Sequence, residues 1–322
     1  MTIFLLGAIP PPLGGVSVYC MRKLNSLRLQ NIDVRHFDSR YRLNLIKLFF
    51  LFYFYKLKRS SIEVEVNVSN KIVLFFLFVT GISSSCVFVD HNSYRRLKRE
   101  KFGEAILIAF CHKALRIKAV NINIVNYYES KGINMEKVTL MTPYLKPTEA
   151  EVGQAVLSLP KKYHHLAKMD QRNIILCSAW RSVSTESELD LYGILDTLEV
   201  YKQLLPLYPE VNFVLMIGIV TEDAFGSSIR SKIESLKVFP NFIFIDNGAS
   251  QLPFLKNTLA LLRLTKTDGD SVSVREALDF GANVIASNVC PRPEGVICIT
   301  LDEQSSVVDL LTNIINNNRG YL

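Results

Sequence analysis

Short apolar runs alternate with longer amphipathic segments along the chain. The runs have the length of buried strands, and Gly, Pro, Asn or Asp bounds most of them. They occupy residues 2–9, 31–37, 71–79, 85–89, 119–125, 137–141, 173–178, 212–217, 241–246, 259–264, 283–287 and 295–299. Helical spacing of apolar residues is found at 16–27, 104–115, 190–207 and 307–316. This alternation predicts an α/β protein with largely parallel sheets.

The strand and helix alternation occurs in two series of similar size, which indicates two domains. The 322 residues are enough for two hydrophobic cores. Residues 142–171 mix Pro, Glu and Lys with the pair His164-His165, and we interpret them as a linker. We therefore predict two Rossmann-like domains, residues 1–165 and 166–322, facing a cleft. The ligand is expected at the carboxyl ends of the strands.

Composition narrows the class of protein. Hydrophobic residues make up 49% of the chain and charged residues 21%, which is globular rather than disordered. The formal net charge of +7 favours an anionic small substrate or a membrane surface over a dedicated nucleic-acid partner. The six cysteines contain no CxxC pair and lie mostly in apolar surroundings. They indicate buried thiols in a reducing compartment rather than a zinc site.

The most apolar segments raise the question of membrane contact. The N-terminus has no basic region or cleavage site, so we interpret its apolar run as a strand and not a signal peptide. No run reaches the roughly 20 apolar residues of a spanning helix. Residues 48–55 are wholly apolar or aromatic, with Lys47 before them and Lys56 after them. Two interpretations stay open: a core element of the first domain, or a patch in the membrane interface.

A glycine-containing loop follows the first apolar run. The sequence Pro10-Pro11-Pro12-Leu13-Gly14-Gly15 separates that run from the helical spacing at 16–27. A strand, such a loop and a helix open many nucleotide-handling α/β domains, although the GxGxxG fingerprint is absent. Without a Cβ, Gly14 and Gly15 would let the backbone approach a ligand closely. An ordinary tight loop is the alternative.

Residues 265–287 combine a polar loop, a helix start and a buried strand. Asp268 and Glu276 lie eight residues apart, one before Gly269 and one on the expected first helical turn. Loop N–H groups and a helix N-terminus bind anions, and a nearby carboxylate accepts hydrogen bonds from sugar hydroxyls. The pattern predicts a site for a nucleotide with phosphate and ribose. As alternatives, Glu276 could complement the helix dipole, and Asp268 and Asp270 could be turn or cap residues.

The same segment resembles the donor-binding segment of retaining GT-B glycosyltransferases of glycosyltransferase family 4. Their pattern is an acidic residue, seven residues, Glu-Ala, a Gly and an apolar strand. Glu276 matches the second acid, while Asp268 stands where the family usually has Glu. The Gly14-Gly15 loop and His91, which follows an apolar run, fit the same family. The resemblance covers nearly the whole chain and implies the GT-B fold.

The resemblance also implies roles for individual residues. Glu276 would hold the ribose hydroxyls, Asp268 would approach the donor sugar, and Arg181 would bind phosphate. The other donor-site residues implied are Gly14, Gly15, Gly269, Asp270 and Ser271, and His91 would lie beside the transferred sugar. His91, Asp268 and Arg181 are the candidate catalytic residues. The family usually has a Lys five residues after the Arg, where this chain has Glu186; Arg263 or Lys266 could replace that cation.

The implied activity is a retaining hexosyltransferase. It would move a sugar from a UDP- or GDP-linked donor to a lipid-linked glycan acceptor in O-antigen, lipopolysaccharide or capsule synthesis. No metal or cofactor is expected, although Asp268-Gly269-Asp270 has the spacing of a metal-binding pair. The enzyme would be cytoplasmic or peripheral at the inner face of the cytoplasmic membrane. The alternatives are a sugar-nucleotide 2-epimerase and a non-catalytic partner subunit, the latter favoured by Glu186.

Overall fold

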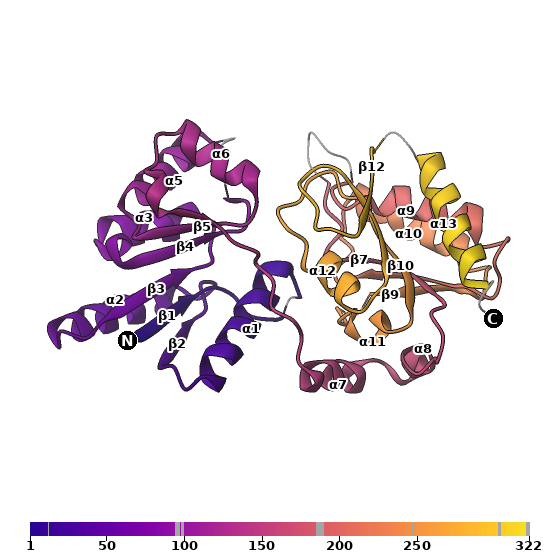
Figure 1. Ribbon diagram of the computed structural model, residues 1–322, viewed down its shortest axis with the longest axis horizontal. Coiled ribbons are helices and arrows are strands. Elements are labelled where there is room, and N and C mark those ends of the chain that lie inside the picture. Colours follow the sequence, from indigo (N-terminus) through magenta and orange to yellow (C-terminus); the bar gives the residue numbers. More distant parts are fainter. Residues whose placement is uncertain are drawn as a thin grey trace. The chain divides into compact units, whose positions relative to one another are not determined.

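The computed structural model describes residues 1–11, 13–93, 97, 100–184, 190–246, 248–301 and 304–319. The chain folds as two compact units, Met1–Leu145 and Lys146–Leu322 (Figure 1). Each unit contains a six-stranded sheet in which all neighbouring strands are parallel. The predicted α/β class is therefore confirmed in both halves of the chain.

The first unit has the strand order β2-β1-β3-β4-β5-β6. Its strands are β1 (Thr2–Leu6), β2 (Val34–Phe37), β3 (Ile62–Val66), β4 (Cys86–Asp90), β5 (Arg116–Ala119) and β6 (Val138–Leu140). Its helices are α1 (Gly15–Leu29), α2 (Arg42–Leu57), α3 (Lys71–Val79), α5 (Lys101–Lys113) and α6 (Ile122–Ser130), with 3-10 turns η1 (Ile82–Ser85) and η2 (Met135–Lys137). The chain changes direction across the sheet between β1 and β3. Such a switch point opens a crevice at the carboxyl ends of the strands.

The second unit has the strand order β12-β11-β10-β7-β8-β9. Its strands are β7 (Ile174–Ala179), β8 (Asn212–Ile217), β9 (Phe242–Ile245), β10 (Thr258–Arg263), β11 (Asn283–Ser287) and β12 (Val296–Ile299). Its helices are α7 (Glu149–Ser158), α8 (His164–Ala167), α9 (Ile194–Leu204), α10 (Ala224–Leu236), α11 (Leu252–Leu255), α12 (Val272–Asp279) and α13 (Gln304–Arg319), with the 3-10 turn η3 (Lys161–Tyr163). Here the switch point lies between β7 and β10.

Apolar cores lie against the sheets. In the first unit Phe4, Phe88 and Phe110 are fully buried, and the rings of Phe88 and Phe110 pack edge to face at 5.4 Å. In the second unit one core packs under α9, α10 and α13, and another under α7, α8, α11 and α12. The second sheet is thus covered on both faces, which explains why its strands are continuously apolar.

Two predicted strands are wrong in whole or in part. Residues 71–79 form helix α3, and residues 119–125 contain only the end of β5 before α6 begins. Asparagine caps decide both cases. The side chain of Asn70 accepts a hydrogen bond from Ile72 N at 2.9 Å, and that of Asn121 accepts one from Ile124 N at 3.1 Å. These caps satisfy N–H groups that a helix start leaves unpaired.

The third strand of the first unit was missed by the sequence pattern. Its residues Ile62–Val66 include Glu63 and Glu65, which hide the apolar character of a strand. Glu65 is nevertheless buried, because Tyr19 OH and Asn67 Nδ2 donate hydrogen bonds to its Oε1 at 3.4 and 3.2 Å. A long-range partner, Tyr19, and a local one, Asn67, therefore allow a carboxylate inside this strand.

The boundary between the units lies at Leu145 and Lys146, twenty residues before the predicted one. The predicted linker at 142–171 is wrong for most of its length, since it contains α7 and α8. Both helices belong to the second unit because Leu159 and Leu166 are buried in its core. Asn257 also donates to Leu166 O at 2.9 Å, which fixes α8 to the second sheet.

The aromatic segment at 48–55 lies in helix α2. Leu48 and Phe52 are buried in the first core, while Phe50 and Phe54 are exposed on the opposite face. Each of the two interpretations of this segment is therefore compatible with part of its residues. Among the described helices, none is both long and apolar enough to cross a bilayer.

Candidate functional site

The loops at the switch point of the second sheet are packed closely together. Gly193 caps α9 with a left-handed φ of 64°, and a Cβ there would lie 2.1 Å from Leu264 O. Only glycine fits this conformation and this approach. Lys266 N and Thr265 Oγ1 both donate to Leu191 O, at 2.9 and 2.7 Å. The segment after β10 is thus fastened to the start of α9.

Glu276 lies in the second turn of α12, since the helix begins at Val272, and not in the first turn as predicted. Its side chain is 5% exposed and accepts a hydrogen bond from Gln251 Nε2 at 2.8 Å. Ser178, near the end of β7, donates to Gln251 Oε1 at 2.6 Å. A buried carboxylate of this kind must be hydrogen-bonded, and the Ser178–Gln251 pair fixes one of its oxygens.

Asp268 lies between two guanidinium groups. Its Oδ2 accepts from Arg263 Nε at 3.2 Å and from Arg292 Nη1 at 3.0 Å, and its Oδ1 accepts from Gly269 N at 3.2 Å. Burial pushes the pKa of Asp268 upward, but the charges of Arg263 and Arg292 outweigh it and hold the pKa below its ordinary value. Asp268 is therefore ionised at neutral pH, within a cluster of net charge +1.

The two acidic residues of the motif belong to one hydrogen-bond network. Arg263 Nη1 donates to Ser178 O at 3.3 Å, and Ser178 Oγ leads through Gln251 to Glu276. Arg263 also stacks over the ring of Tyr192 at 4.9 Å. The network spans β7, β10 and α12 at the switch point. Polar groups are thus concentrated where α/β sheets bind ligands.

Residues 269–271 form the short turn between Asp268 and α12. Gly269 and Ser271 are buried, and Ser271 is the N-cap residue, although its side chain bonds Ser273 Oγ at 2.8 Å rather than a helix N–H. Asp270 forms a two-pronged ion pair with Arg275 at 2.7 Å. Both carboxylates of the Asp268-Gly269-Asp270 pair therefore already neutralise guanidinium groups.

Arg181 is exposed in the loop that follows β7. The positive charge of Arg181 acts on Asp223, the N-cap residue of α10. Hydrogen bonds from Gly226 N and Thr221 Oγ1 lower the pKa of Asp223, and the charge of Arg181 contributes a smaller part. Glu186, where the family usually has Lys, lies outside the described residues. Lys266 Nζ pairs with Asp196 Oδ2 at 2.7 Å.

The Gly14-Gly15 pair starts helix α1 in the first unit. Gly14 is the N-cap residue with an extended φ of −133°, and its N–H donates to Ser17 Oγ at 3.0 Å. A Cβ on Gly14 would meet only Ser17 Oγ, at an ordinary contact distance of 3.8 Å. Packing within the unit therefore does not require glycine at position 14. The close approach of a ligand to the backbone is a remaining explanation for this glycine.

His91 follows β4 and contacts Asn67, the residue directly after β3. Its Nε2 lies 2.9 Å from Asn67 Oδ1, and its ring packs edge to face on Tyr19 at 5.2 Å. Burial lowers the pKa of His91 to about 4. The imidazole is neutral at pH 7, so Nε2 is the protonated nitrogen that donates to Asn67. The histidine thus lies at the carboxyl edge of the first sheet without a charge.

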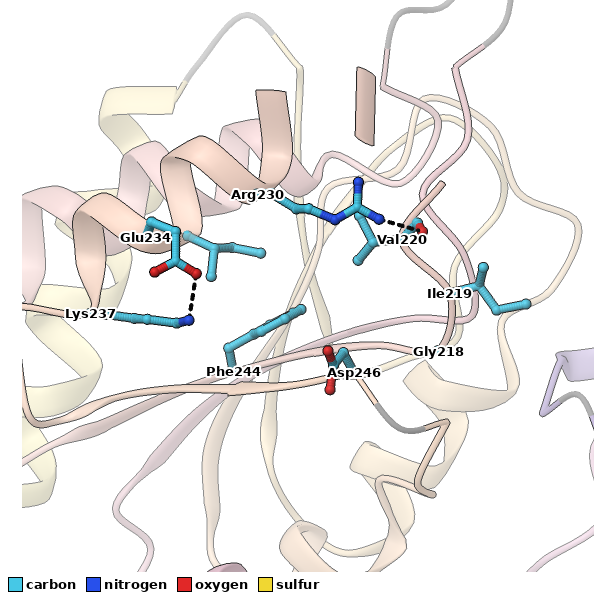
Figure 2. A pocket seen from close by; sticks show the side chains of 9 residues that line it. Gly218, Ile219, Val220, Arg230, Glu234, Lys237, Phe244 and Asp246 are labelled. Carbon is cyan, nitrogen blue, oxygen red and sulfur yellow. Dashed lines mark hydrogen bonds and ion pairs between the residues drawn. The ribbon is translucent and has the colours of Figure 1, made fainter. Parts of the chain in front are cut away.

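A separate hollow of about 400 Å³ opens beside β8 and β9 (Figure 2). It is lined by the loop from Gly218 to Val220, by Arg230 of α10, by Lys237 directly after α10, and by Asp246. Arg230 donates to Val220 O at 3.1 Å, and Lys237 pairs with Glu234 at 2.5 Å (Figure 2). None of the predicted site residues lines this hollow, so the switch-point network, which contains Asp268 and Glu276, is the better candidate.

Sequence reasoning missed three members of the network: Ser178, Gln251 and Arg292. Arg292 stands in Pro291-Arg292-Pro293, in the loop that follows β11, and a cation between two prolines beyond a buried strand is a detectable signal. Gln251 and Ser178 carry no such signal, because only the fold brings them beside Glu276. The motif therefore indicates the site but not the residues that orient it.

No family model matches the sequence, and no curated protein matches it either. Solved structures do match over almost the whole chain. The Anabaena protein HepE in complex with UDP-glucose superposes with a TM-score of 0.68 and 10% identity, covering 99% of this chain and 91% of that one.

Two further structures agree over 98% of this chain and 91% of their own. A trehalose-6-phosphate protein from E. coli, bound with UDP-2-fluoro glucose, has a TM-score of 0.63 and 12% identity. The lipopolysaccharide outer core galactosyltransferase WaaB has a TM-score of 0.57 and 14% identity. At such low identity these matches establish architecture alone. The chain has the two-domain α/β fold of the GT-B glycosyltransferases.

Proposed function

We propose that this protein is a retaining glycosyltransferase of the family 4 type that uses a nucleotide-diphosphate sugar. The observation that carries the proposal is the network joining Asp268 and Glu276 at the switch point of the second sheet. The neighbours crystallised with UDP-glucose and UDP-2-fluoro glucose have the same fold and support a UDP- or GDP-linked donor. WaaB, a galactosyltransferase by name, supports the reaction class.

Donor recognition would use the second unit. The ribose hydroxyls would donate to the Glu276 carboxylate, which Gln251 keeps in a fixed orientation. The donor sugar would lie near Asp268, and backbone N–H groups of residues 269–271 would face the sugar and diphosphate. In the first unit Gly14 and Gly15 would approach the diphosphate, and His91 would lie beside the transferred sugar.

The chemistry needs electrostatic stabilisation more than a nucleophile. Glycosyl transfer builds positive charge at the anomeric carbon and negative charge on the leaving diphosphate. In front-face transfer the acceptor hydroxyl attacks from the side that the diphosphate leaves, which retains the anomeric configuration. The leaving phosphate would accept the proton of that hydroxyl. Neutral His91 would act by hydrogen bonding and not as an acid, since its pKa is lowered to about 4. No metal or cofactor enters this scheme.

Arg181 is the cation proposed for the diphosphate. It is exposed after β7, at the edge of the sheet where the donor is expected. Arg263 and Lys266 are weaker substitutes for the missing Lys, because Arg263 is paired with Asp268 and Lys266 with Asp196. The +1 charge of the Arg263–Asp268–Arg292 cluster would still attract an anion through space.

The acceptor is proposed to be a lipid-linked glycan in the synthesis of bacterial O-antigen or capsule. The likeness to WaaB and the basic, aromatic character of the first unit support this assignment. Such an acceptor would place the enzyme at the inner face of the cytoplasmic membrane, where an anionic surface meets the net charge of +7.

Two variants test the proposed reaction. Glu276→Ala should weaken binding of the donor and lower turnover by about 100-fold or more, because a charged hydrogen-bond partner of the ribose is lost. His91→Ala should leave nucleotide binding intact and lower the rate of transfer. Calorimetric titration with donor and an assay of the product's anomeric configuration separate the two effects. Wild-type kinetics in Glu276→Ala would remove the nucleotide-site assignment.

A further inference from the structure

Helix α2 carries an apolar stripe on its outer face. Leu43, Ile46, Phe50, Phe54 and Leu57 recur every three or four residues, which places them on one side of the helix. Phe50 is 66% exposed and Leu57 84%, whereas Leu48 and Phe52 on the opposite side are buried. The first core is therefore complete without the stripe. Folding of the unit does not explain why these five positions are apolar.

Helix α3 repeats the pattern beside α2. Ile72, Phe75 and Val79 are exposed at the same helical spacing. The two helices contact each other, because the rings of Phe49 and Phe76 lie 6.4 Å apart and Tyr53 OH donates to Thr80 O. Both stripes point away from the shared core. We call the exposed apolar side chains of the two contacting helices the α2–α3 face; they are Leu43, Ile46, Phe50, Phe54, Leu57, Ile72, Phe75 and Val79.

The charged residues of α2 and α3, and those that directly follow α2, are all basic. Helix α2 carries Arg42, Lys47 and Lys56, and Lys58 and Arg59 follow it at once. No acidic residue occurs between Asp38 and Glu63, or between Glu65 and Asp90. Lys58 Nζ lies 4.4 Å from the ring centre of Phe54, so a cation adjoins the stripe. Lys71 of α3 is basic too, but an acidic residue, Glu100, pairs with it.

We propose that the α2–α3 face docks on an anionic lipid surface. Aromatic and aliphatic side chains would enter the headgroup region, and the Lys and Arg side chains would contact lipid phosphates. Neither α2 nor α3 carries an acidic residue, which favours an anionic lipid over a protein partner of mixed charge. The helices would lie on the bilayer surface, since a spanning helix needs about 20 apolar residues and α2 is only 16 residues long in all, polar ones included. The proposal goes beyond sugar transfer and does not depend on it.

Vesicle co-sedimentation tests the proposal without any sugar substrate. The full chain is incubated with vesicles of phosphatidylcholine alone, or of equal parts phosphatidylcholine and phosphatidylglycerol. Wild type should bind the mixed vesicles and bind the neutral ones weakly, with affinity that falls as salt rises. Phe50→Glu with Phe54→Glu should lower the affinity by about tenfold or more. Lys47→Gln with Lys58→Gln should remove much of the preference for phosphatidylglycerol.

Matched variants separate docking from stability. Leu207→Glu with Val238→Glu adds the same charge at two exposed apolar positions of the second unit and should leave vesicle binding unchanged. Phe50→Glu with Phe54→Glu should keep the wild-type unfolding temperature, because both rings are exposed. The proposal is wrong if wild type binds neither kind of vesicle, or if the Phe50/Phe54 and Leu207/Val238 substitutions change vesicle binding equally. A wild-type dimer that the Phe50 and Phe54 substitutions dissociate would instead assign the face to a second copy.

Discussion

Arg292 illustrates how a single residue can hold the candidate site together. Its Nη1 pairs with Asp268, and its Nε donates to Ser287 O at 2.8 Å, which ties the loop after β11 to the loop after β10. The Arg292 side chain is only 3% exposed. Breaking a buried ion pair by removing one partner is costly, because the remaining charge loses its compensation.

We therefore predict that Arg292→Met lowers the free energy of unfolding by about 3 kcal/mol. Urea unfolding followed by circular dichroism measures the loss. Arg275→Met is the matched control, since Arg275 also pairs with an aspartate of the same segment but is more exposed. Its cost should be about 1 kcal/mol or less. Equal losses in the two variants would show that Asp268 does not depend on Arg292.

His91 predicts how stability depends on pH. The pKa of His91 falls from 6.5 in the unfolded chain to about 4 in the folded one. Acid therefore protonates the unfolded chain first and favours unfolding. The contribution of His91 is complete above pH 6.5 and is lost as the pH falls toward 4, by at most about 1.4 kcal/mol per pH unit.

Urea titrations of wild type and His91→Gln between pH 7.5 and pH 4.5, the range that brackets about two pH units of this transition, measure the effect. The stability of wild type relative to His91→Gln should fall as the pH falls. A constant difference would mean that His91 titrates normally and is more hydrated than its surroundings indicate.

At the scale of elements, α3 shows where the hydrophobic pattern misleads. All of its residues after Lys71 form the unbroken apolar run Ile72–Val79, and such a run cannot distinguish a buried strand from a helix. The Asn70 cap decides the structure. We predict that Asn70→Ala costs about 1 kcal/mol of stability, while Asn70→Asp keeps the cap and costs little. Thermal unfolding of both variants is the test, and an equal loss in both would deny the cap this role.

The strand pattern was most informative in the second unit. The predicted ranges 212–217 and 283–287 coincide with β8 and β11, because both strands are buried on two faces and read as continuous apolar runs. The edge of the first sheet and strand β3 were harder to predict from this pattern. In β3, Glu63 and Glu65 alternate with apolar residues. Charged residues in a strand become interpretable only when their long-range partners are known.

The candidate site, like the strands, could be predicted only in part from the sequence. Asp268 and Glu276 were predicted because they are close in sequence and have a recognisable spacing. Their partners Ser178, Gln251 and Arg292 come from other elements, and the fold alone brings them together. The roles of Gly14, Gly15, His91 and Arg181 in binding a donor stay predictions.

At the scale of the whole molecule, the two units differ from the predicted domains by the helices α7 and α8. Because Leu159 and Leu166 complete a core of the second unit, we expect a fragment of residues 146–322 to fold cooperatively. A fragment of residues 166–322 lacks α7 and should be less stable. Urea unfolding compares the two fragments, and equal stability would place α7 outside the core.

The central claim is that the network around Glu276 binds a nucleotide-diphosphate sugar. A thermal-shift screen with UDP- and GDP-linked sugars tests it most directly, since a ligand of the folded state raises the unfolding temperature. At least one donor should stabilise wild type and Asp279→Asn, which alters an exposed acid of the same helix. The same donor should not stabilise Glu276→Gln. If no nucleotide sugar stabilises wild type, or if Glu276→Gln responds equally, the claim is contradicted.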